Sequence, residues 1–234
     1  MANAKFKRRS EIVRIVREKK QMSCVELSKT FGVTEETIRK DLQELSEKGE
    51  LLRTFGGAMV REYGTERSLD QRIIQNLEQK KRIAQKAVST LKSGDLVAMD
   101  AGSTVTMMAK AIPDHLKITV LTNSLEICNI LSEKENVTVI CTGGKLHKKS
   151  MSLQGMLTES TINSLNAEKA FISCAAFDIK LGVMDSNEEA ARTKQSMIRN
   201  AREVYLLMDS SKIGCIAYIT TCPASSITKV VTDN

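Results

Sequence analysis

The sequence of 234 residues predicts two domains of different fold class, a small α+β domain followed by a larger α/β domain. Within residues 1–60, three short helical patterns precede a glycine-containing hairpin. From about residue 77, apolar strands and helices alternate. The chain is also longer than a typical single domain of about 100–150 residues. We therefore expect an N-terminal domain at residues 1–60, a polar linker at 61–75 and a second domain at 76–234.

The N-terminal domain is expected to contain three helices. The first is predicted over residues 6–19, where apolar residues recur at helical spacing between basic ones. Ser23 and Glu26 form a capping-box pattern that opens the second helix, and Gly32 permits the left-handed conformation that ends it. Thr34 is a good N-cap for the third helix. These features predict a helix-turn-helix, because a glycine-containing turn separates the second and third helices.

The third helix is expected to enter the major groove of DNA with its N-terminal half, and the hairpin at residues 51–58 would be a wing. Arg39 can donate two hydrogen bonds to a guanine, whereas Lys40 is better suited to a phosphate. The basic residues near the N-terminus would form an arm that contacts phosphates. The residues expected to contact DNA are Lys7, Arg8, Arg9, Thr34, Glu36, Thr37, Arg39, Lys40, Arg53 and Thr54.

The distribution of charge supports this interpretation. The formal net charge is +7, and the first 20 residues hold eight basic and two acidic side chains. A basic N-terminus suits a domain that binds a polyanion. The alternative is a three-helix packing unit in which the same charges form an ordinary solvated surface.

Several classes of protein are disfavoured. The six cysteines include no C-x-x-C pair and there are two histidines, which argues against a zinc site. The cysteines in apolar runs resemble buried hydrophobic residues of a reducing compartment. No apolar stretch approaches the roughly 20 residues that span a bilayer. We expect a cytoplasmic protein that binds DNA, contacts no membrane, and carries no metal or cofactor.

The second domain is expected to contain a parallel sheet with helices on both faces, because its strands alternate with helices. A helix carrying Leu77 and Ile83 leads into the first strand. The predicted strands lie at residues 96–99, 117–121, 137–141, 169–174, 204–208 and 228–232. The predicted helices lie near residues 104–111, 124–132, 155–165 and 187–201.

Polar residues follow the strands of this predicted sheet. In open α/β sheets, ligands bind in the crevice outside the carboxyl ends of the strands. The Gly-Ser-Thr at 102–104 opens a helix, and free backbone N–H groups at such a position bind phosphate. Gly143 would allow close approach of a ligand, and Lys212 would add positive charge. Each residue alone is also explained as a cap or a turn, but together they predict a site for a small phosphorylated ligand.

The sequence resembles the DeoR family of bacterial transcriptional regulators over nearly its whole length. The resemblance lies in residues 24–28, 31–42, 52–58, 80–84, 100–104, 121–124, 143–146 and 209–212. It implies a winged helix-turn-helix and a sensor domain resembling ribose-5-phosphate isomerase. It also implies a repressor of a sugar uptake or catabolism operon, relieved by a phosphorylated sugar, that acts as a dimer or tetramer. The residues expected to line the effector site are Asp100, Gly102, Ser103, Thr104, Thr122, Asn123, Ser124, Gly143, Asp178 and Lys212.

The sequence departs from the family after the fourth predicted strand. Members often show Gly-Ala-Asp-Gly-Ile-Asp there, whereas this chain has Ser-Cys-Ala-Ala-Phe-Asp at 173–178. Ala175 replaces the first acid, and Asp178 retains the second. Acids in this region perform proton transfer in the related isomerase, so the change argues against an enzyme. Two alternatives remain: an isomerase-like enzyme with an accessory domain, and a DNA-binding regulator that no longer senses a sugar.

Overall fold

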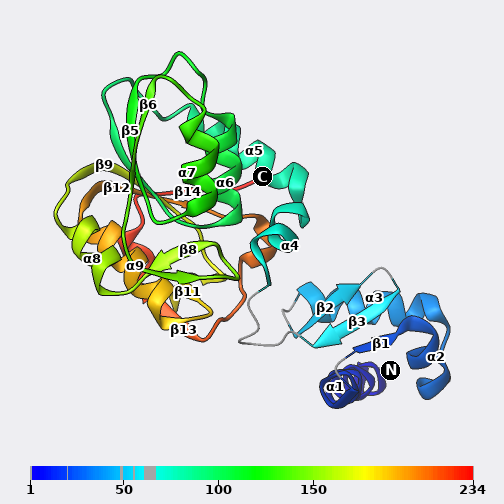
Figure 1. Cartoon of the computed structure of the whole chain (residues 1–234). Helices are drawn as coiled ribbons and strands as arrows, with labels where there is room; N and C mark the ends of the chain where they lie inside the picture. Colours follow the sequence, from blue (N-terminus) through cyan, green and yellow to red (C-terminus); the bar gives the residue numbers. More distant parts are fainter. Residues whose placement is uncertain (1, 20, 48–49, 55, 61–66, 234) are drawn as a thin grey trace. The chain divides into compact units, whose positions relative to one another are not determined.

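The computed structural model describes residues 2–19, 21–47, 50–54, 56–60 and 67–233 (Figure 1). The chain forms two compact units, Met1–Tyr63 and Gly64–Asn234. We call them the head and the sensor, and each is described by itself. The predicted linker at 61–75 falls partly at residues 61–66, which lie outside the described residues.

The head contains three helices and a small antiparallel sheet. Its elements are α1 (Ala2–Lys19), β1 (Gln21–Ser23), α2 (Cys24–Phe31), α3 (Glu35–Glu47), β2 (Leu51–Thr54) and β3 (Gly57–Val60), with strand order β1-β3-β2. Ile12, Leu27, Ile38 and Leu42 are fully buried between the helices. The predicted α+β class is confirmed. Strand β1 was not predicted, because three residues are too few to show an alternating pattern.

Local interactions explain where the head helices begin and end. The capping box is present: the Ser23 side chain accepts a hydrogen bond from the Glu26 backbone, and Glu26 accepts one from the Ser23 backbone. Gly32 ends α2 with φ of 62°. Gly57 allows β3 to pair with β1, since a Cβ at this position would lie 2.1 Å from the backbone oxygen of Met22.

The sensor is built on a six-stranded parallel sheet in the order β14-β12-β9-β4-β5-β6. The strands are β4 (Leu96–Met99), β5 (Ile118–Thr122), β6 (Val137–Cys141), β9 (Ala167–Ile172), β12 (Ala201–Leu207) and β14 (Lys229–Val231). Each of the six predicted strands is therefore present, and the α/β class is confirmed. The strands following β4 extend the sheet on one side, and those following β9 extend it on the other. The switch point between β4 and β9 is where such sheets bind ligands.

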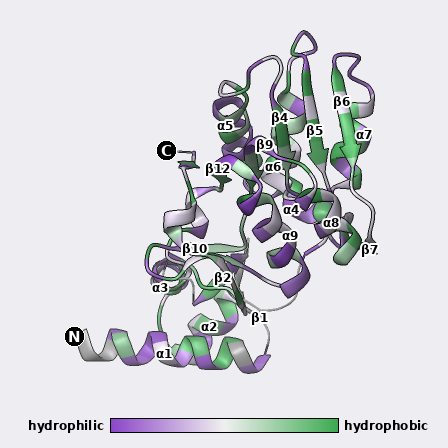
Figure 2. Ribbon diagram, turned by 90° about the vertical axis from the view of Figure 1, so that its left-hand side faces the viewer, coloured by the Kyte–Doolittle hydropathy of each residue, from purple (hydrophilic) through white to green (hydrophobic). Residues whose placement is uncertain are grey.

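Helices cover both faces of this sheet (Figure 1). On one face, α5 (Leu77–Val88), α6 (Ser103–Ala111) and α7 (Leu125–Ser132) pack on side chains such as Val97 and Met99. On the other face, α8 (Met156–Asn163) and α9 (Glu188–Arg199) pack on side chains such as Ala98 and Ile172. Neighbouring residues of one strand thus enter opposite cores, as the pleat requires. The strands of the sheet are mainly apolar in consequence (Figure 2).

Shorter elements complete the sensor. They are α4 (Leu69–Ile74), a hairpin of β7 (Lys145–His147) and β8 (Ser152–Gln154), an antiparallel sheet of β10 (Ala176–Asp178), β11 (Gly182–Asp185) and β13 (Ile219–Cys222), and the 3-10 turns η1 (Ser210–Lys212) and η2 (Ala224–Ser226). These elements were not predicted. In the part of the chain that the structure describes, no helix is both long and apolar enough to cross a membrane.

Candidate functional site

The N-terminal half of α3 exposes the side chains that were expected to contact DNA. The side chains of Glu36, Arg39 and Lys40 retain 65%, 50% and 75% of their exposure. Arg39 pairs with Glu35 at 2.8 Å, and Lys40 lies 3.8 Å from Glu36. Pairs of this kind between exposed residues on one helix contribute little free energy, so they can be exchanged for contacts with DNA.

Thr34 and Thr37 define the tip of the same face. The Thr34 hydroxyl lies 2.9 Å from that of Thr37 and accepts a hydrogen bond from the Thr37 backbone at 3.3 Å. Thr34 therefore caps α3 as expected. The two hydroxyls are arranged at the end of the helix that would enter the groove first.

The predicted basic arm is revised by the structure. Arg8 and Arg9 lie within α1, and their Nε atoms donate to the two oxygens of Asp41 at 2.6 and 2.7 Å. Asp41 is 1% exposed, and Arg9 also bonds to Glu44. These arginines are engaged inside the head, where they fix α1 against α3. Lys7 is exposed and remains a candidate for phosphate contact.

The wing carries one candidate that the structure describes. Arg53 is exposed on β2 and donates to the side-chain oxygen of Gln43 on α3 at 2.5 Å. This contact joins the wing to the helix that it flanks. The side chain of Thr54 lies outside the described residues.

In the sensor, Asp100 occupies the switch point of the sheet. It follows β4 directly, is 5% exposed, and accepts hydrogen bonds from the backbone and hydroxyl of Ser173 at 3.3 and 3.4 Å. Ser173 follows β9, so the two strands on either side of the switch point are joined here. Gly102 must be glycine, since a Cβ would lie 2.0 Å from the Ser173 hydroxyl.

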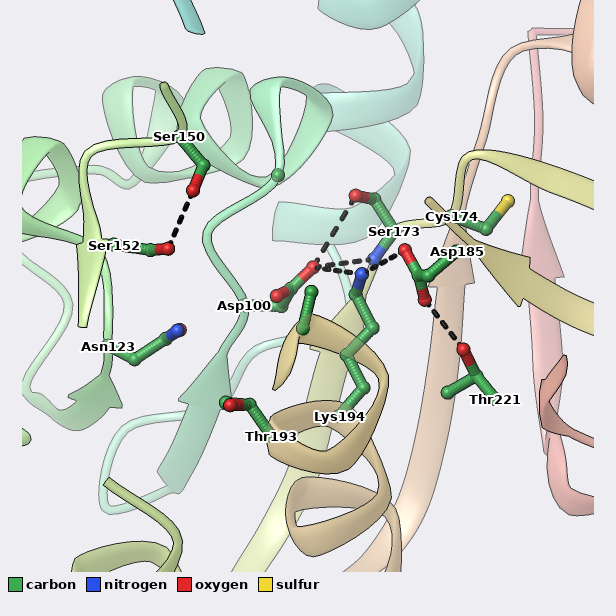
Figure 3. Close-up of polar contacts among 12 residues, drawn as sticks. Asp100, Asn123, Ser150, Ser152, Ser173, Cys174, Asp185, Thr193, Lys194 and Thr221 are labelled. Atoms are coloured by element: carbon green, nitrogen blue, oxygen red, sulfur yellow. Dashed lines mark hydrogen bonds and ion pairs between the residues drawn. The ribbon is translucent and has the colours of Figure 1, made fainter. Parts of the chain in front are cut away.

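Two residues that were not predicted complete a buried ionic network with Asp100. The Nζ atom of Lys194 on α9 lies 2.5 Å from Asp185 and 3.6 Å from Asp100. Asp185 in turn accepts a hydrogen bond from Thr221 at 2.7 Å. Figure 3 shows Lys194 between the two carboxylates, with Thr221 beyond Asp185. All four side chains are buried, so the chain maintains two carboxylates and one ammonium group without solvent.

Burial and ion pairing have opposing effects on the pKa of Asp100 and on that of Lys194. Burial raises the pKa of Asp100, and Lys194 offsets part of that effect. Burial alone would lower the pKa of Lys194, but Asp100 and Asp185 together raise it above its ordinary value. Lys194 is therefore a permanent cation beside the switch point. Cys174 is nearby, and burial raises the pKa of its thiol to about 12, so it is not a nucleophile at neutral pH.

Four buried polar atoms near the carboxyl ends of the strands have no hydrogen-bond partner among the described residues. They are Thr104 Oγ1, Asn123 Oδ1, Thr142 Oγ1 and Gln154 Oε1. Buried polar atoms without protein partners are uncommon, and each of these oxygens can accept a hydrogen bond from a bound molecule. Thr104 lies in the first turn of α6, a helix whose N-cap, Gly102, provides no side-chain bond. The backbone N–H groups of this turn and these oxygens together favour a polar, anionic ligand.

Other predicted effector residues form hydrogen bonds within the protein near the ends of the strands. The Thr122 hydroxyl donates to the Met99 backbone at 2.7 Å, and the Ser124 hydroxyl caps α7. The Gly143 backbone oxygen accepts from Thr158 at 2.6 Å. Gly144 is packed closely within the protein, where a Cβ would lie 2.2 Å from the Thr158 hydroxyl, and the ligand contact expected at Gly143 stays a prediction. Ser103 is buried in the first turn of α6.

The loop after β12 adds positive charge. The Nζ atom of Lys212 donates to the backbone oxygen of Cys174 at 2.5 Å, which ties this loop to the one after β9. Lys80 on α5 is 3% exposed. Burial, followed by the charge of Lys212, lowers the pKa of Lys80 to about 8. Because the charge of Lys212 disfavours the charged form of Lys80, an anion bound near both side chains would favour it.

Asp178 was expected to line the effector site, but its carboxylate is engaged in a turn. It ends β10 and its carboxylate accepts hydrogen bonds from the backbone of Lys180 and Leu181 at 2.8 and 3.0 Å. These bonds lower its pKa. Asp178 stabilises the turn between β10 and β11, a role that could not be seen before the small antiparallel sheet was known.

Sequence reasoning missed Lys194, Asp185 and Lys80. Lys194 had a visible signal, because it lies three residues from Ala191 and Met197 on the buried face of α9. A lysine on an apolar stripe requires a buried partner. Asp185 ends an apolar run, and its partner Lys194 lies nine residues further along the chain, on the next helix. No cluster of three or more metal-ligating side chains occurs in the described segments.

Comparison with known proteins gives a consistent picture. Residues 8–63 match the DeoR-like helix-turn-helix domain, and residues 75–234 match the DeoR C terminal sensor domain. The chain is 40% identical over 228 residues to an uncharacterized HTH-type transcriptional regulator, YulB, of Bacillus subtilis, covering 97% of this chain and 88% of that protein. It is 30% identical over 226 residues to the glycerol-3-phosphate regulon repressor of Escherichia coli, covering 97% and 90%.

Solved structures with a similar fold have low sequence identity. The eIF2B delta subunit of Chaetomium thermophilum matches with a TM-score of 0.53 and 14% identity, covering 71% of this chain and 58% of that one. Ribose 5-phosphate isomerase A of Methanocaldococcus jannaschii matches with a TM-score of 0.45 and 16% identity, covering 59% and 55%.

Proposed function

The chain belongs to the DeoR family of transcriptional regulators, and we propose that it represses genes of sugar uptake or catabolism until a phosphorylated sugar binds its sensor. The observation that carries this proposal is the arrangement at the carboxyl ends of β4 and β9. Lys194 is a buried cation beside Asp100 there, the N-cap of α6 provides no side-chain bond, and Thr104 in the first turn of α6 has a buried oxygen without a protein partner. Asn123 and Thr142 add such oxygens after the neighbouring strands β5 and β6. This combination suits an anionic ligand that also has hydroxyl groups.

Each part of the ligand has a candidate partner. The phosphate group would bind at the first turn of α6, formed by Gly102, Ser103 and Thr104, with Lys80 and Lys212 supplying charge. The hydroxyl groups would bind Asn123 and the oxygens of Thr142 and Gln154, which have unused hydrogen-bonding capacity. Asp100 would orient the ligand from the switch point.

The names of two relatives support the kind of operon that we propose this chain represses. The E. coli relative is a repressor of the glycerol-3-phosphate regulon. A relative from Staphylococcus epidermidis, 32% identical over 235 residues, is named as a lactose phosphotransferase system repressor. We infer that this chain represses a comparable operon and therefore acts in the cytoplasm.

On the DNA side, Arg39, Thr37 and Thr34 would contact bases or phosphates, and Lys7, Lys40 and Arg53 would contact the backbone of the duplex. We propose that the protein binds its operator as a dimer or tetramer. Effector binding would shift the population away from the arrangement in which two heads match the half-site spacing.

We propose no catalytic activity. Proton transfer on a sugar phosphate needs a carboxylate that can accept a proton at the ligand. Position 175 carries alanine, and the carboxylates of Asp100 and Asp185 are both engaged with Lys194. This arrangement favours binding over turnover.

The proposal is tested by measuring operator binding with the full-length protein. DNA from upstream of its own gene and neighbouring genes is titrated, with and without a panel of triose, pentose and hexose phosphates at millimolar concentration. We expect at least one compound to weaken binding tenfold or more, and its unphosphorylated parent to have no effect. Unchanged binding with every phosphorylated compound contradicts sugar-phosphate sensing, while absence of operator binding contradicts repression.

A further inference from the structure

The hairpin of β7 and β8 carries a chain of hydrogen-bonded side chains that leads to Gln154. His147 Nδ1 lies 2.8 Å from the hydroxyl of Ser150, and that hydroxyl lies 2.7 Å from the hydroxyl of Ser152. The side-chain nitrogen of Gln154 donates to the Ser152 hydroxyl at 3.2 Å. Ser150, Ser152 and Gln154 are 5%, 1% and 3% exposed, so most of the chain is shielded from solvent.

Strand β8 is fixed to the segments that follow β5 and β6. The backbone N–H of Leu153 donates to the backbone oxygen of Asn123, the first residue after β5, at 2.7 Å. Figure 3 shows Ser152 near Asn123, as this pairing requires. Gly144, in the loop after β6, lies against the backbone of Gln154, because a Cβ at this glycine would be 2.7 Å from the Gln154 oxygen. Gln154 therefore lies beside two loops of the proposed effector site.

The side-chain amide of Asn123 has only one favourable orientation. Its Nδ2 atom donates to the backbone oxygen of Leu153 at 2.9 Å. A backbone oxygen can only accept, so the amide nitrogen must face Leu153. The Oδ1 atom is buried and has no partner among the described residues. Asn123 therefore offers a fixed acceptor oxygen to a bound molecule.

The orientation of the Gln154 amide follows from the direction of the hydrogen-bonded chain. A hydroxyl group has a single hydrogen to donate. With Gln154 as the donor to Ser152, the Ser152 hydroxyl is available to donate to Ser150. Ser150 then donates to His147 Nδ1, so each hydroxyl hydrogen is used once. The Oε1 atom of Gln154 is left without a partner among the described residues.

We propose that Gln154 determines which class of phosphorylated ligand the sensor accepts: together with Asn123 it presents acceptor oxygens that fit the hydroxyl groups of a sugar or polyol phosphate and reject a phosphorylated carboxylic acid. The chain from His147 to Ser152 is the positioning group, because it holds the amide with its oxygen toward the ligand. A carboxylate has acceptors alone, so it would leave both amide oxygens buried and unpaired. Sites built to bind a hydroxyl group discriminate strongly for this reason. This inference rests on the proposed function and narrows its ligand.

The first test uses the wild-type full-length protein and is therefore independent of any effect of mutation on folding. Each sugar phosphate of the panel is paired with the phosphorylated acid of the same chain length, for example glucose 6-phosphate with 6-phosphogluconate. We expect calorimetry to show that the tightest-binding sugar phosphate exceeds its acid at least tenfold in affinity. An acid that binds as tightly as its sugar would overturn the inference while the proposed function stands. If wild type binds no phosphorylated compound, both fail.

The substitution Gln154→Leu tests the acceptor itself, because it removes the amide with little change in size. Affinity for the tightest-binding sugar phosphate should fall at least tenfold, while affinity for the acid changes less than threefold. Gln85→Leu is the matched control, since it makes the same change at an exposed position of α5 and should leave both affinities unaltered. A full preference for the sugar in Gln154→Leu would overturn the role of Gln154.

The substitution Ser150→Ala tests the positioning chain and leaves the acceptor in place. Without this hydroxyl, Ser152 can donate to the Gln154 oxygen instead, and the amide nitrogen can turn toward the ligand. We expect the preference for the sugar phosphate over its acid to fall at least threefold. Ser132→Ala removes an exposed hydroxyl of α7 and should retain the preference of wild type. An unchanged preference in Ser150→Ala would contradict the positioning role of the chain.

Discussion

The exposed face of α3 and the ionic network of the sensor differ in how their charged side chains are paired and buried. Arg39 and Lys40 are half exposed or more and pair with glutamates one turn away on the same helix. Asp100, Asp185 and Lys194 are buried and come from three separate elements. Exposed pairs contribute about 0–1 kcal/mol, whereas removing one member of a buried pair is strongly destabilising. The head can therefore change its contacts freely, but the sensor cannot lose a charge without losing stability.

The largest effect is expected at Lys194. The substitution Lys194→Met leaves two buried carboxylates without a cation and should lower the free energy of unfolding by about 3–5 kcal/mol, as measured by urea denaturation. Arg192→Met is the matched control, since Arg192 pairs with Glu188 on the same helix but is 60% exposed. Equal stabilities of the two variants would contradict the comparison.

A steric effect of intermediate size is expected at Gly102. The substitution Gly102→Ala forces a Cβ against the Ser173 hydroxyl and should cost about 1–3 kcal/mol of stability. Gly143→Ala should be tolerated, because its Cβ would meet Leu157 at an ordinary 3.9 Å. The double variant Gly102→Ala, Ser173→Gly should recover most of the loss. Failure to recover would show that the clash lies elsewhere.

On the exposed face, Arg39→Ala should leave stability nearly unchanged and weaken operator binding by about 1–3 kcal/mol, with relaxed preference at one base pair. Fluorescence anisotropy with operator variants measures both. Lys40→Ala should instead weaken all sequences alike and lower the salt dependence of binding by about one unit. An unaltered footprint for both variants would exclude α3 as the DNA-contacting helix.

The smallest effect concerns the pH dependence of the sensor. Burial, the charge of Lys212 and, to a lesser degree, Arg72 lower the pKa of Lys80 to about 8 from 10.5, against the opposing effect of Asp209. Between these values Lys80 is charged only in the unfolded chain, so its contribution to stability rises with pH there. Phosphate binding needs the charged form and should weaken severalfold from pH 7 to pH 9, while a phosphate ester stays doubly charged.

Calorimetry at the two pH values measures this effect. Lys80→Arg, which remains charged throughout, should remove the pH dependence. A wild-type affinity that does not change between pH 7 and pH 9 would mean that Lys80 is not near the bound phosphate.

Local patterns of the molecule could be predicted from the sequence, whereas contacts between separate segments could not. Strands and helices of the central sheet were predictable because each repeats an apolar pattern, and the capping box at Ser23 is local. The partner of Arg8 and Arg9 and the contact of Lys194 with Asp100 were not predictable, since those contacts join residues distant in sequence. The short elements around the crevice, such as α4 and β10, were missed because few residues carry their pattern. Asp185 belongs to one of these elements, β11, so this part of the site was missed together with the strand that carries it.

The pairing of Arg8 and Arg9 with Asp41 has a consequence for how operator preference can diverge. Because two guanidinium groups from α1 hold α3 at one buried carboxylate, the tilt of the helix is set before any duplex is encountered, and little freedom is lost on docking. Replacing solvent-facing residues of α3 then alters the preferred bases while the scaffold stays intact. Duplicated copies of such a gene can acquire separate operators through a few surface substitutions.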